Sequence, residues 1–183
     1  MLVIVVGRSG AGKSSFIEAM DLEKYHCVLS QPMVNELKRR GQEVSHDTIH
    51  ALAKEWYAAN RWWQVEYILN QLGERAFLII DGLRYFFELE ELRRRFPQTI
   101  VVKIVSTPEI RYQRLTQRGK IPLTTVEEFE RLERDESQDM GLEAILVSAD
   151  LVVENGGSLD ELREKAQRFA RLLRPLIEQT ERS

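Results

Sequence analysis

The sequence has a single cysteine, no long apolar run and no excess of basic residues. One thiol, Cys27, cannot form a disulfide within the chain, and its apolar neighbours predict a small buried side chain. The longest apolar runs, residues 2–6 and 76–80, are far too short to cross a bilayer. No basic segment precedes Leu2, so a signal peptide is not expected. Together these absences predict a cytoplasmic protein without a membrane partner.

Acidic residues slightly outnumber basic ones, with 29 Asp and Glu against 26 Lys and Arg. The resulting net charge of −3 gives no overall basic field to attract nucleic acid, which argues against a kinase that acts on nucleic-acid ends. Any phosphate-binding site must therefore be local. A chain of 183 residues is long enough for a substantial core, and we expect residues 1–183 to form a single domain without a linker.

Short apolar, β-branched runs alternate with longer helical segments along the chain. The predicted strands are residues 2–6, 26–29, 76–80, 100–105 and 151–153. Helix starts are indicated by proline after Thr107 and by capping boxes that begin at Thr125 and Ser158. This alternation is typical of an α/β fold with a parallel sheet covered by helices on both faces. Residues 31–74 contain no strand signal and predict two or three inserted helices.

The stretch GRSGAGKS follows the first predicted strand and precedes a helix, and it fills the pattern G-x-x-x-x-G-K-[ST]. Glycines let backbone N–H groups point inward at phosphate oxygens, and the helix N-terminus adds partial positive charge. A plain turn is the alternative, and a dinucleotide site is disfavoured because Ser15 stands where a third glycine would be needed. The residues expected to hold a nucleoside triphosphate are Gly7, Ser9, Gly10, Ala11, Gly12, Lys13, Ser14 and Ser15.

A carboxylate closes the third predicted strand, in LIIDGLR. If this strand lies beside the first, Asp81 meets the glycine loop (residues 7–14) at the carboxyl edge of the sheet. There it could hold Mg²⁺ together with the Ser14 hydroxyl, or act as a helix N-cap. Arg84 would lie at the same edge, where it could bind an anionic acceptor or form an ordinary surface ion pair.

Arginines flank the segment 119–124 on both sides. Arg114 and Arg118 lie four residues apart on the preceding helix, and Arg134 lies on the following one. Guanidinium groups on both sides of a closing loop suit phosphoryl transfer, since they meet the charge on the transferred group. For Arg111 and Arg131 we expect salt bridges within their own helices, for instance Arg131 with Asp135.

Five motifs occur in the order GRSGAGKS, DGLR, RLTQR, RDE and ENGG. In this they resemble the nucleoside monophosphate kinase group of P-loop phosphotransferases over nearly the whole chain. Archaeal adenylate-kinase-related and dephospho-coenzyme A kinase-like proteins are the most similar members. The resemblance implies a P-loop NTPase three-layer sandwich with strand order 2-3-1-4-5, an acceptor-binding insertion at 31–74 and a short lid at 119–130.

The same resemblance implies roles for particular residues. ATP or another nucleoside triphosphate would be the donor and Mg²⁺ the metal. Lys13, Asp81, Arg118 and Arg134 would be catalytic, with the two arginines on phosphates. Residues near the adenine would be Arg114, Asn155 and Gly156.

The acceptor segment departs from these relatives. After the second strand they carry an aspartate and an arginine, whereas this chain has SQPMVNELKRR. The remaining candidates for acceptor binding are Arg84, Lys38, Arg39 and Trp62. Trp62 is included because adjacent tryptophans at 62 and 63 point about 100° apart on a helix and cannot both be core.

The stretch HDTIH imitates a zinc-binding helix, with His46 and His50 on one face. It lacks the glutamate base and a third ligand, and Ser45 is explained as a helix cap, so no zinc site is expected.

Two functions remain open from the sequence. The first is an ATP- and Mg²⁺-dependent kinase of a small nucleotide or nucleotide-like acceptor. An acceptor phosphate would need no base, whereas an acceptor hydroxyl would need one, for which Asp81 is the candidate. The second is a nucleotide-binding regulatory ATPase that has lost its acceptor site. The oligomeric state is not indicated.

Overall fold

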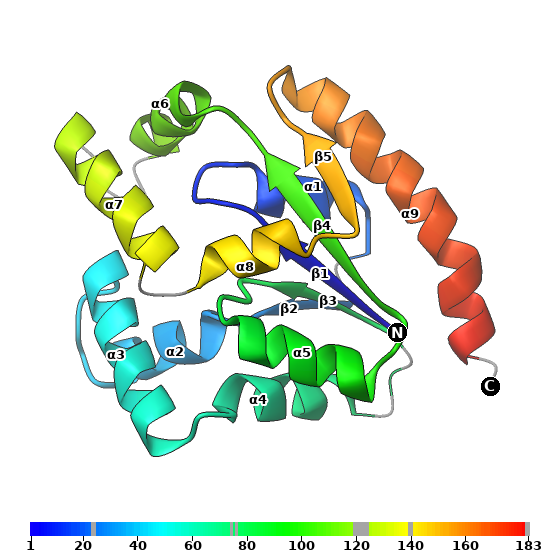
Figure 1. Cartoon of the computed structure of the whole chain (residues 1–183), viewed down its shortest axis with the longest axis horizontal. Helices are drawn as coiled ribbons and strands as arrows, with labels where there is room; N and C mark the ends of the chain where they lie inside the picture. Colours follow the sequence, from blue (N-terminus) through cyan, green and yellow to red (C-terminus); the bar gives the residue numbers. More distant parts are fainter. Residues whose placement is uncertain (23–24, 74, 76, 119–124, 139–140, 182–183) are drawn as a thin grey trace.

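The structure is a computed structural model that describes residues 1–22, 25–73, 75, 77–118, 125–138 and 141–181, without the side chains of 118, 137, 138 and 180. In these ranges five strands form one parallel sheet (Figure 1): β1 (Leu2–Val6), β2 (His26–Val28), β3 (Leu78–Asp81), β4 (Thr99–Val105) and β5 (Leu151–Glu154). Their order is β2-β3-β1-β4-β5. The predicted fold class and strand order are confirmed.

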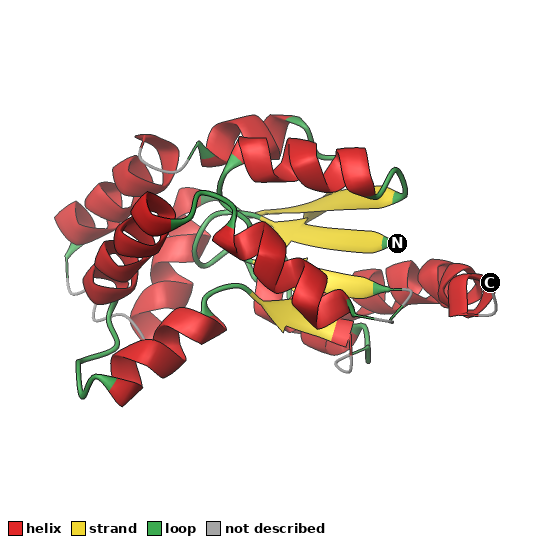
Figure 2. Cartoon of the chain, turned by 90° about the horizontal axis from the view of Figure 1, so that it is seen from below, coloured by secondary structure: helices red, strands yellow, loops and turns green. Residues whose placement is uncertain are grey.

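Helices cover both faces of the sheet, as Figure 2 shows. Alternate strand residues point to opposite faces. On one face, Leu2 and Ile4 of β1 and Leu78 and Ile80 of β3 pack against three helices. These helices are α4 (Trp63–Leu72), α5 (Phe86–Arg95) and α8 (Leu142–Val147). Val3 and Val5 pack with α1 (Lys13–Ala19) and α9 (Leu159–Glu181) on the other face. Both faces are therefore buried, which explains why the central strands read as unbroken apolar runs.

The observed strands keep close to the predicted ones. Cys27 is buried on β2, as predicted, with 3% of its surface exposed. Asp81 is the last residue of β3 and not the first residue beyond it, while Ala76 of the predicted run lies outside the described residues. The edge strand β5 is the least covered, with Leu151 44% exposed and Val152 60% exposed.

The inserted segment forms three helices, α2 (Gln31–Arg39), α3 (His46–Ala59) and α4. Ser45 caps α3 as predicted, because its hydroxyl accepts the Thr48 N–H while the Thr48 hydroxyl accepts the Ser45 N–H. A separate small core joins these helices through Met33, Leu37 and Leu52. In Figure 1, α2 and α3 stand beyond the ends of the strands toward which the arrows point.

Two further helices, α6 (Pro108–Arg118) and α7 (Val126–Gln138), lie at the same end of the sheet (Figure 1). Their predicted starts are confirmed. Thr107 Oγ1 accepts the Ile110 N–H at 3.4 Å, and Thr125 and Glu128 form both bonds of the capping box at 3.2 Å. Residues 119–124 of the expected lid lie outside the described residues. Across the described helices, none has both the length and the apolar composition needed to span a membrane.

Candidate functional site

The glycine loop joins β1 to α1 in a conformation that requires glycine. Gly10 and Gly12 have φ angles of +78° and +103°, which side chains with a Cβ rarely adopt. A Cβ at Gly10 would lie 2.8 Å from the Arg111 carbonyl oxygen, and one at Gly12 would lie 2.2 Å from Asn155 Nδ2. The loop backbone is therefore packed against α6 and the end of β5, with no room for larger residues.

Lys13 begins α1, and its side chain folds back over the loop. Its Nζ donates to the Gly7 carbonyl oxygen at 2.8 Å and approaches the Arg8 carbonyl oxygen at 3.4 Å. Burial lowers the pKa of Lys13, and the nearby Asp81 carboxylate opposes this shift without cancelling it. The ammonium group is thus held across the mouth of the loop by the loop's own carbonyl oxygens.

Asp81 reaches the loop because β3 lies directly beside β1, with Asp81 in register with Val5. Its side chain is nearly buried, with 9% of the residue exposed. Behind it, His26 Nε2 on β2 lies 4.0 Å from Asp81 Oδ2. The carboxylate therefore stands at the carboxyl edge of the sheet, as predicted from the end of the apolar run.

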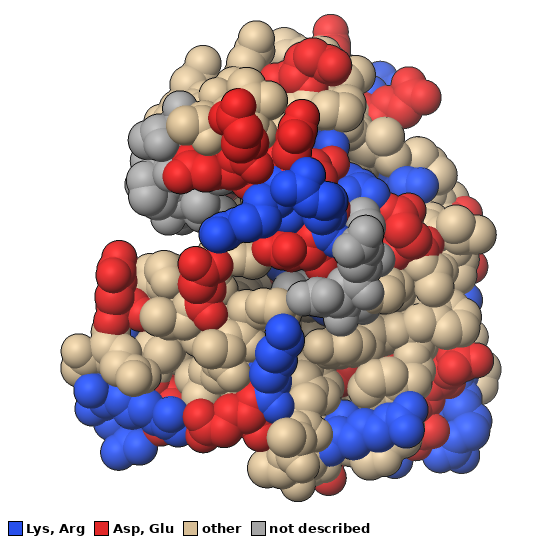
Figure 3. All heavy atoms as spheres, turned by 60° about the vertical axis from the view of Figure 1, so that its left-hand side comes forward, with Lys and Arg blue, Asp and Glu red and all other residues tan. Residues whose placement is uncertain are grey.

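A cavity of about 260 Å³ opens beside Lys13, and we call it the Lys13 cavity. It is lined by Lys13, Ser14, Val28, Ser30, Met33, His46, Ile49, His50, Ala53, Tyr57, Gln64, Asp81, Gly82, Arg84 and Tyr85. The glycine loop and the end of β3 form one side, and α2, α3 and α4 form the other. In Figure 3 a notch separates the upper and lower parts of the molecule, with basic and acidic side chains along its upper rim.

The helix α7 places a carboxylate against the glycine loop. Glu136 is 1% exposed and accepts hydrogen bonds from the Ser9 N–H at 3.1 Å and the Ser9 hydroxyl at 2.5 Å. Arg84 Nη1 lies 3.4 Å from the same carboxylate. Burial alone would raise the pKa of Glu136, but Arg84, Ser9 and Lys13 lower it below its ordinary value. Glu136 is therefore an ionised carboxylate bound by the loop.

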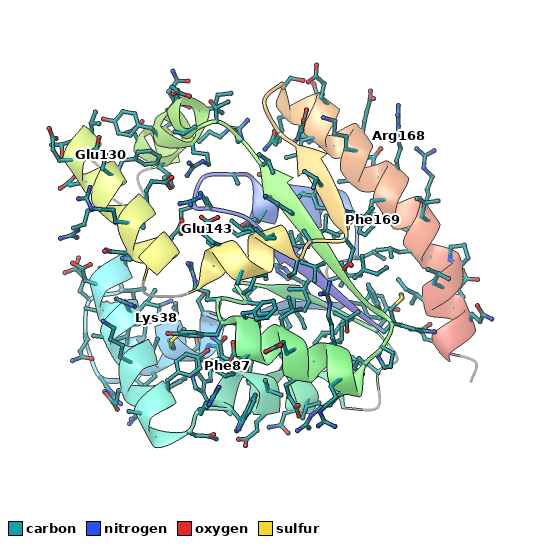
Figure 4. All side chains as sticks on the ribbon, in the orientation of Figure 1. Lys38, Phe87, Glu130, Glu143, Arg168 and Phe169 are labelled. Atoms are coloured by element: carbon teal, nitrogen blue, oxygen red, sulfur yellow. The ribbon has the colours of Figure 1, made fainter. Side chains whose placement is uncertain are left out.

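A second carboxylate of α7 supports this arrangement. Glu133 accepts from both terminal nitrogens of Arg111, at 2.5 and 2.7 Å, and Arg111 is 3% exposed. Arg8 pairs with Glu133 and with Glu143, which Figure 4 shows at the start of α8. For Arg111 an ion pair within its own helix was expected, but the observed pair with Glu133 joins α6 to α7.

Asn155 and Arg114 buttress the loop from the side of β5. Asn155 is 4% exposed and donates from Nδ2 to the Ala11 carbonyl oxygen at 2.7 Å. Arg114 Nη2 lies 3.3 Å from Asn155 Oδ1. Gly156 comes next, with open space where a Cβ would be. Ser15 lies in α1 beside a shallower depression that α9 also lines.

Several predicted residues are not brought to this site. Trp62 packs against Phe87 with ring centroids 5.3 Å apart, and Arg39 bonds to Glu36. Lys38 is exposed, and Trp62, Lys38 and Arg39 are all absent from the lining of the Lys13 cavity. These three predictions of acceptor contacts are therefore not supported, because the helices turn those side chains to other faces.

Arg134 also points elsewhere, since its side chain is 59% exposed and its Nη1 lies 3.9 Å from the Glu130 carboxylate, which Figure 4 shows on α7. The side chain of Arg118 lies outside the described residues. Arg131 pairs with Asp47 at 3.5 Å, where a pair with Asp135 was expected.

Sequence reasoning missed Glu136 and Gln64. Glu136 lies seven residues after Phe129 and four after Leu132, so all three share the buried face of α7. An acidic residue at a position of the apolar face was therefore the signal in the sequence. The histidines of HDTIH were considered for zinc alone, and both line the Lys13 cavity. Within the described ranges, no three His, Cys, Asp or Glu side chains gather as metal ligands would.

The residues at this site fit a magnesium-bound nucleoside triphosphate. The donors of Ser9 already hold an oxyanion, the Glu136 carboxylate. The Ser14 hydroxyl and the Asp81 carboxylate line one cavity, and they are oxygen ligands of the kind that Mg²⁺ prefers.

Solved structures with the same fold include several small-molecule kinases. A sugar kinase from Janibacter sp. HTCC2649 aligns with a TM-score of 0.58 and 17% identity over 96% of both chains. Shikimate kinase from Acinetobacter baumannii gives 0.56 and 20% identity over 94% of this chain and 92% of its own. A gluconokinase from Sinorhizobium meliloti 1021 gives 0.53 and 20% identity over 97% and 95%. The chain therefore shares the fold of these proteins.

No family model matches the sequence. Among individual proteins, UPF0200 protein MK0400 of Methanopyrus kandleri is 34% identical over 179 residues, which cover 94% of this chain and 90% of the relative. A UPF0200 protein of Sulfurisphaera tokodaii is 30% identical over 171 residues, covering 91% and 93%. With this identity along nearly its whole length, the chain belongs to the UPF0200 family.

Proposed function

We propose that this protein is an ATP- and Mg²⁺-dependent phosphotransferase that moves the terminal phosphate to a small acceptor. One observation carries the proposal. A single cavity is lined at one side by Lys13, Ser14 and Asp81, and at the other by α2, α3 and α4. A donor on the glycine loop and an acceptor among the inserted helices would share this space, as direct transfer between them requires.

Each group beside the loop has a role in this scheme. Backbone N–H groups of the glycine loop and the Lys13 ammonium would bind the phosphates. Mg²⁺, held by Ser14 and Asp81, would neutralise charge on the phosphate oxygens. Arg84 lies where it can meet charge on the transferred group. The cavity walls would position the acceptor and exclude water from the reaction.

Coupled measurement of ADP release tests this proposal. The whole chain is supplied with Mg²⁺ and ATP, or GTP in parallel, and with nucleoside monophosphates, nucleosides, sugars and dephospho-coenzyme A in turn. We expect at least one acceptor to stimulate ADP release far above the rate without acceptor. Absence of stimulation by every compound, in a protein shown by calorimetry to bind nucleotide, would contradict transferase activity.

A regulatory ATPase is the second candidate, and the acceptor segment supports it. At the start of α2, Gln31 bonds to Asn35, and Arg39 bonds to Glu36, so these polar groups contact their own helix. A switch of this kind would bind nucleotide tightly, hydrolyse it slowly and ignore small acceptors. Rapid transfer to any acceptor in the same assay excludes it.

A further inference from the structure

The charge around the Lys13 cavity is unevenly distributed. Among the described residues that line it, Lys13 and Arg84 carry the positive charges, and both lie on the loop side. Arg84 is already within 3.4 Å of Glu136, and Lys13 bonds to its own loop. The described lining of α2, α3 and α4 has no lysine or arginine, and its basic side chains are the imidazoles of His46 and His50. A phosphate group on the acceptor is held best by fixed cationic donors, above all arginine, and this wall has none of that kind.

The same wall offers a neutral polar group with unused capacity. Gln64 in the first turn of α4 is 4% exposed and lines the cavity. Its Oε1 has no hydrogen-bond partner among the described residues. An amide oxygen is an acceptor, and leaving it buried without a donor is costly. A hydroxyl or N–H group of a bound molecule would satisfy it.

The remaining surface of the far wall suits a carbon skeleton. Met33, Ile49 and Ala53 supply aliphatic surface and Tyr57 supplies a ring, while Tyr85 adds a second ring from the start of α5. Binding sites of this size combine such apolar walls with a few polar groups that fix orientation. The wall therefore matches a compact molecule with hydroxyl groups better than one with a second phosphate.

We propose that the acceptor is a small hydroxyl compound without a phosphate group, which donates a hydrogen bond to Gln64 and is phosphorylated on a hydroxyl beside Asp81. This inference rests on the phosphotransferase activity proposed above. The acceptor oxygen forms a bond to the terminal phosphorus as the bond from that phosphorus to the bridging oxygen breaks. The nucleoside diphosphate leaves, and the hydroxyl proton passes to an oxygen of the transferred phosphate group.

Matched pairs of acceptors test the substrate class. The whole chain with Mg²⁺ and ATP is assayed with a nucleoside and its monophosphate, and with a sugar and its phosphate. We expect the unphosphorylated member of an accepted pair to have at least about tenfold higher kcat/KM, since the other places a phosphate charge against a wall without lysine or arginine. Faster transfer to the phosphorylated member overturns this inference and leaves the phosphotransferase standing. Nucleotide binding without transfer to either member of any pair overturns both.

Two methionine variants of α4 then test Gln64. In Gln64→Met we expect KM for the accepted compound to rise about ten- to hundredfold, with KM for ATP changed less than about twofold. Gln71→Met makes the same chemical change at an exposed position of the same helix and should leave both values unchanged. Thermal unfolding midpoints of both variants report on folding.

An acceptor analogue without the hydroxyl or N–H group that faces Gln64, tested on the unaltered protein, should show the same rise in KM as Gln64→Met causes for the accepted compound. Equal KM values for the compound in Gln64→Met and the unaltered protein would exclude contact with this residue.

Discussion

At the scale of single residues, the loop depends on Lys13 for its side chain and on Gly12 for the absence of one. The hydrogen bonds of Lys13 Nζ are to carbonyl oxygens of the loop itself. Gly12 acts through the side chain it lacks, because Asn155 Nδ2 fills that space. One residue therefore contributes to binding and the other to shape, and their substitution should have different effects on stability.

Substitution of Lys13 by alanine should abolish turnover and preserve the fold. In the proposed reaction the lost ammonium group would bind the transferred phosphate, so ADP release should fall by about a hundredfold or more. The thermal unfolding midpoint should stay close to that of the unaltered protein. Lys165→Ala is the matched control, since Lys165 also donates to a backbone carbonyl oxygen, that of Glu154. Unchanged turnover in Lys13→Ala would contradict the assignment of the loop.

Gly12→Ala should both destabilise the chain and weaken nucleotide binding. The new methyl group would meet Asn155 Nδ2 at 2.2 Å and displace it from the Ala11 carbonyl oxygen. Gly41→Ala is the control, since Gly41 has a φ of +67° with nothing within 4 Å of an added Cβ. We expect the control to cost about 1–2 kcal/mol for backbone strain alone. Urea unfolding and ATP calorimetry measure the two effects; equal losses in both variants would contradict the packing argument.

At the scale of elements, α7 acts as a cover for the glycine loop. Phe129 and Leu132 pack beside Leu115 of α6, and this contact turns Glu133 and Glu136 toward Arg111 and Ser9. A phosphate group and the Glu136 carboxylate need the same Ser9 donors. Nucleotide binding should therefore compete with the contact between α7 and the loop.

Glu136→Gln should strengthen ATP binding, by about tenfold, because a neutral amide competes less well than a carboxylate for charged and N–H donors. Isothermal calorimetry measures Kd directly. Glu130→Gln removes the same charge from the outer side of α7 and should leave Kd unchanged. Weaker binding in Glu136→Gln would mean that this carboxylate stays in place beside the bound nucleotide.

At the scale of the whole molecule, a buried carboxyl group links the inserted helix α3 to α5, which packs on the sheet. Glu88 at the start of α5 is fully buried and accepts a hydrogen bond of 2.8 Å from the Tyr57 hydroxyl of α3. Burial raises the pKa of Glu88 from 4.5 to about 8, although the Tyr57 hydrogen bond lowers it in part. The folded chain thus holds this proton more tightly than the unfolded chain.

Global stability should therefore fall as pH rises. Between 4.5 and about 8 the folded chain holds one more proton at Glu88 than the unfolded chain, so the free energy of unfolding decreases across this interval. The decrease should be a few kcal/mol. Urea unfolding at several pH values measures it, and Glu88→Gln should reduce the slope. Glu90→Gln, an exposed neighbour on α5, should retain it. An unchanged slope in Glu88→Gln would exclude Glu88 as its source.

The features that depend on residues close together in the sequence could be predicted from it. The strands, the caps of α3 and α7 and the glycine loop each rest on local patterns, and Asp81 follows from the end of an apolar run. The strand order was expected through the resemblance to known kinases.

Helix faces could not be predicted, because they depend on packing between distant segments. Arg134 and Glu136 are two residues apart on α7, yet one is exposed and the other touches Ser9. Trp63 packs against Trp56 while Trp62 lies on Phe87, a choice made by the neighbouring helices. Gln64 gave no local signal, since the cavity it lines is completed by residues of α3 and β3.

The glycine loop is held by neutral and by ionic contacts. Asn155 joins the loop to β4 and α6 through the Ala11 carbonyl, the Val105 carbonyl and Arg114. Glu133 and Glu136 hold α7 over the loop through ion pairs with Arg111 and Arg84, and because Arg111 and Glu136 are buried, dissolved ions screen these pairs much less than exposed ones. In concentrated salt α7 should therefore stay over Ser9, while the more exposed pair of Arg8 with Glu143 weakens.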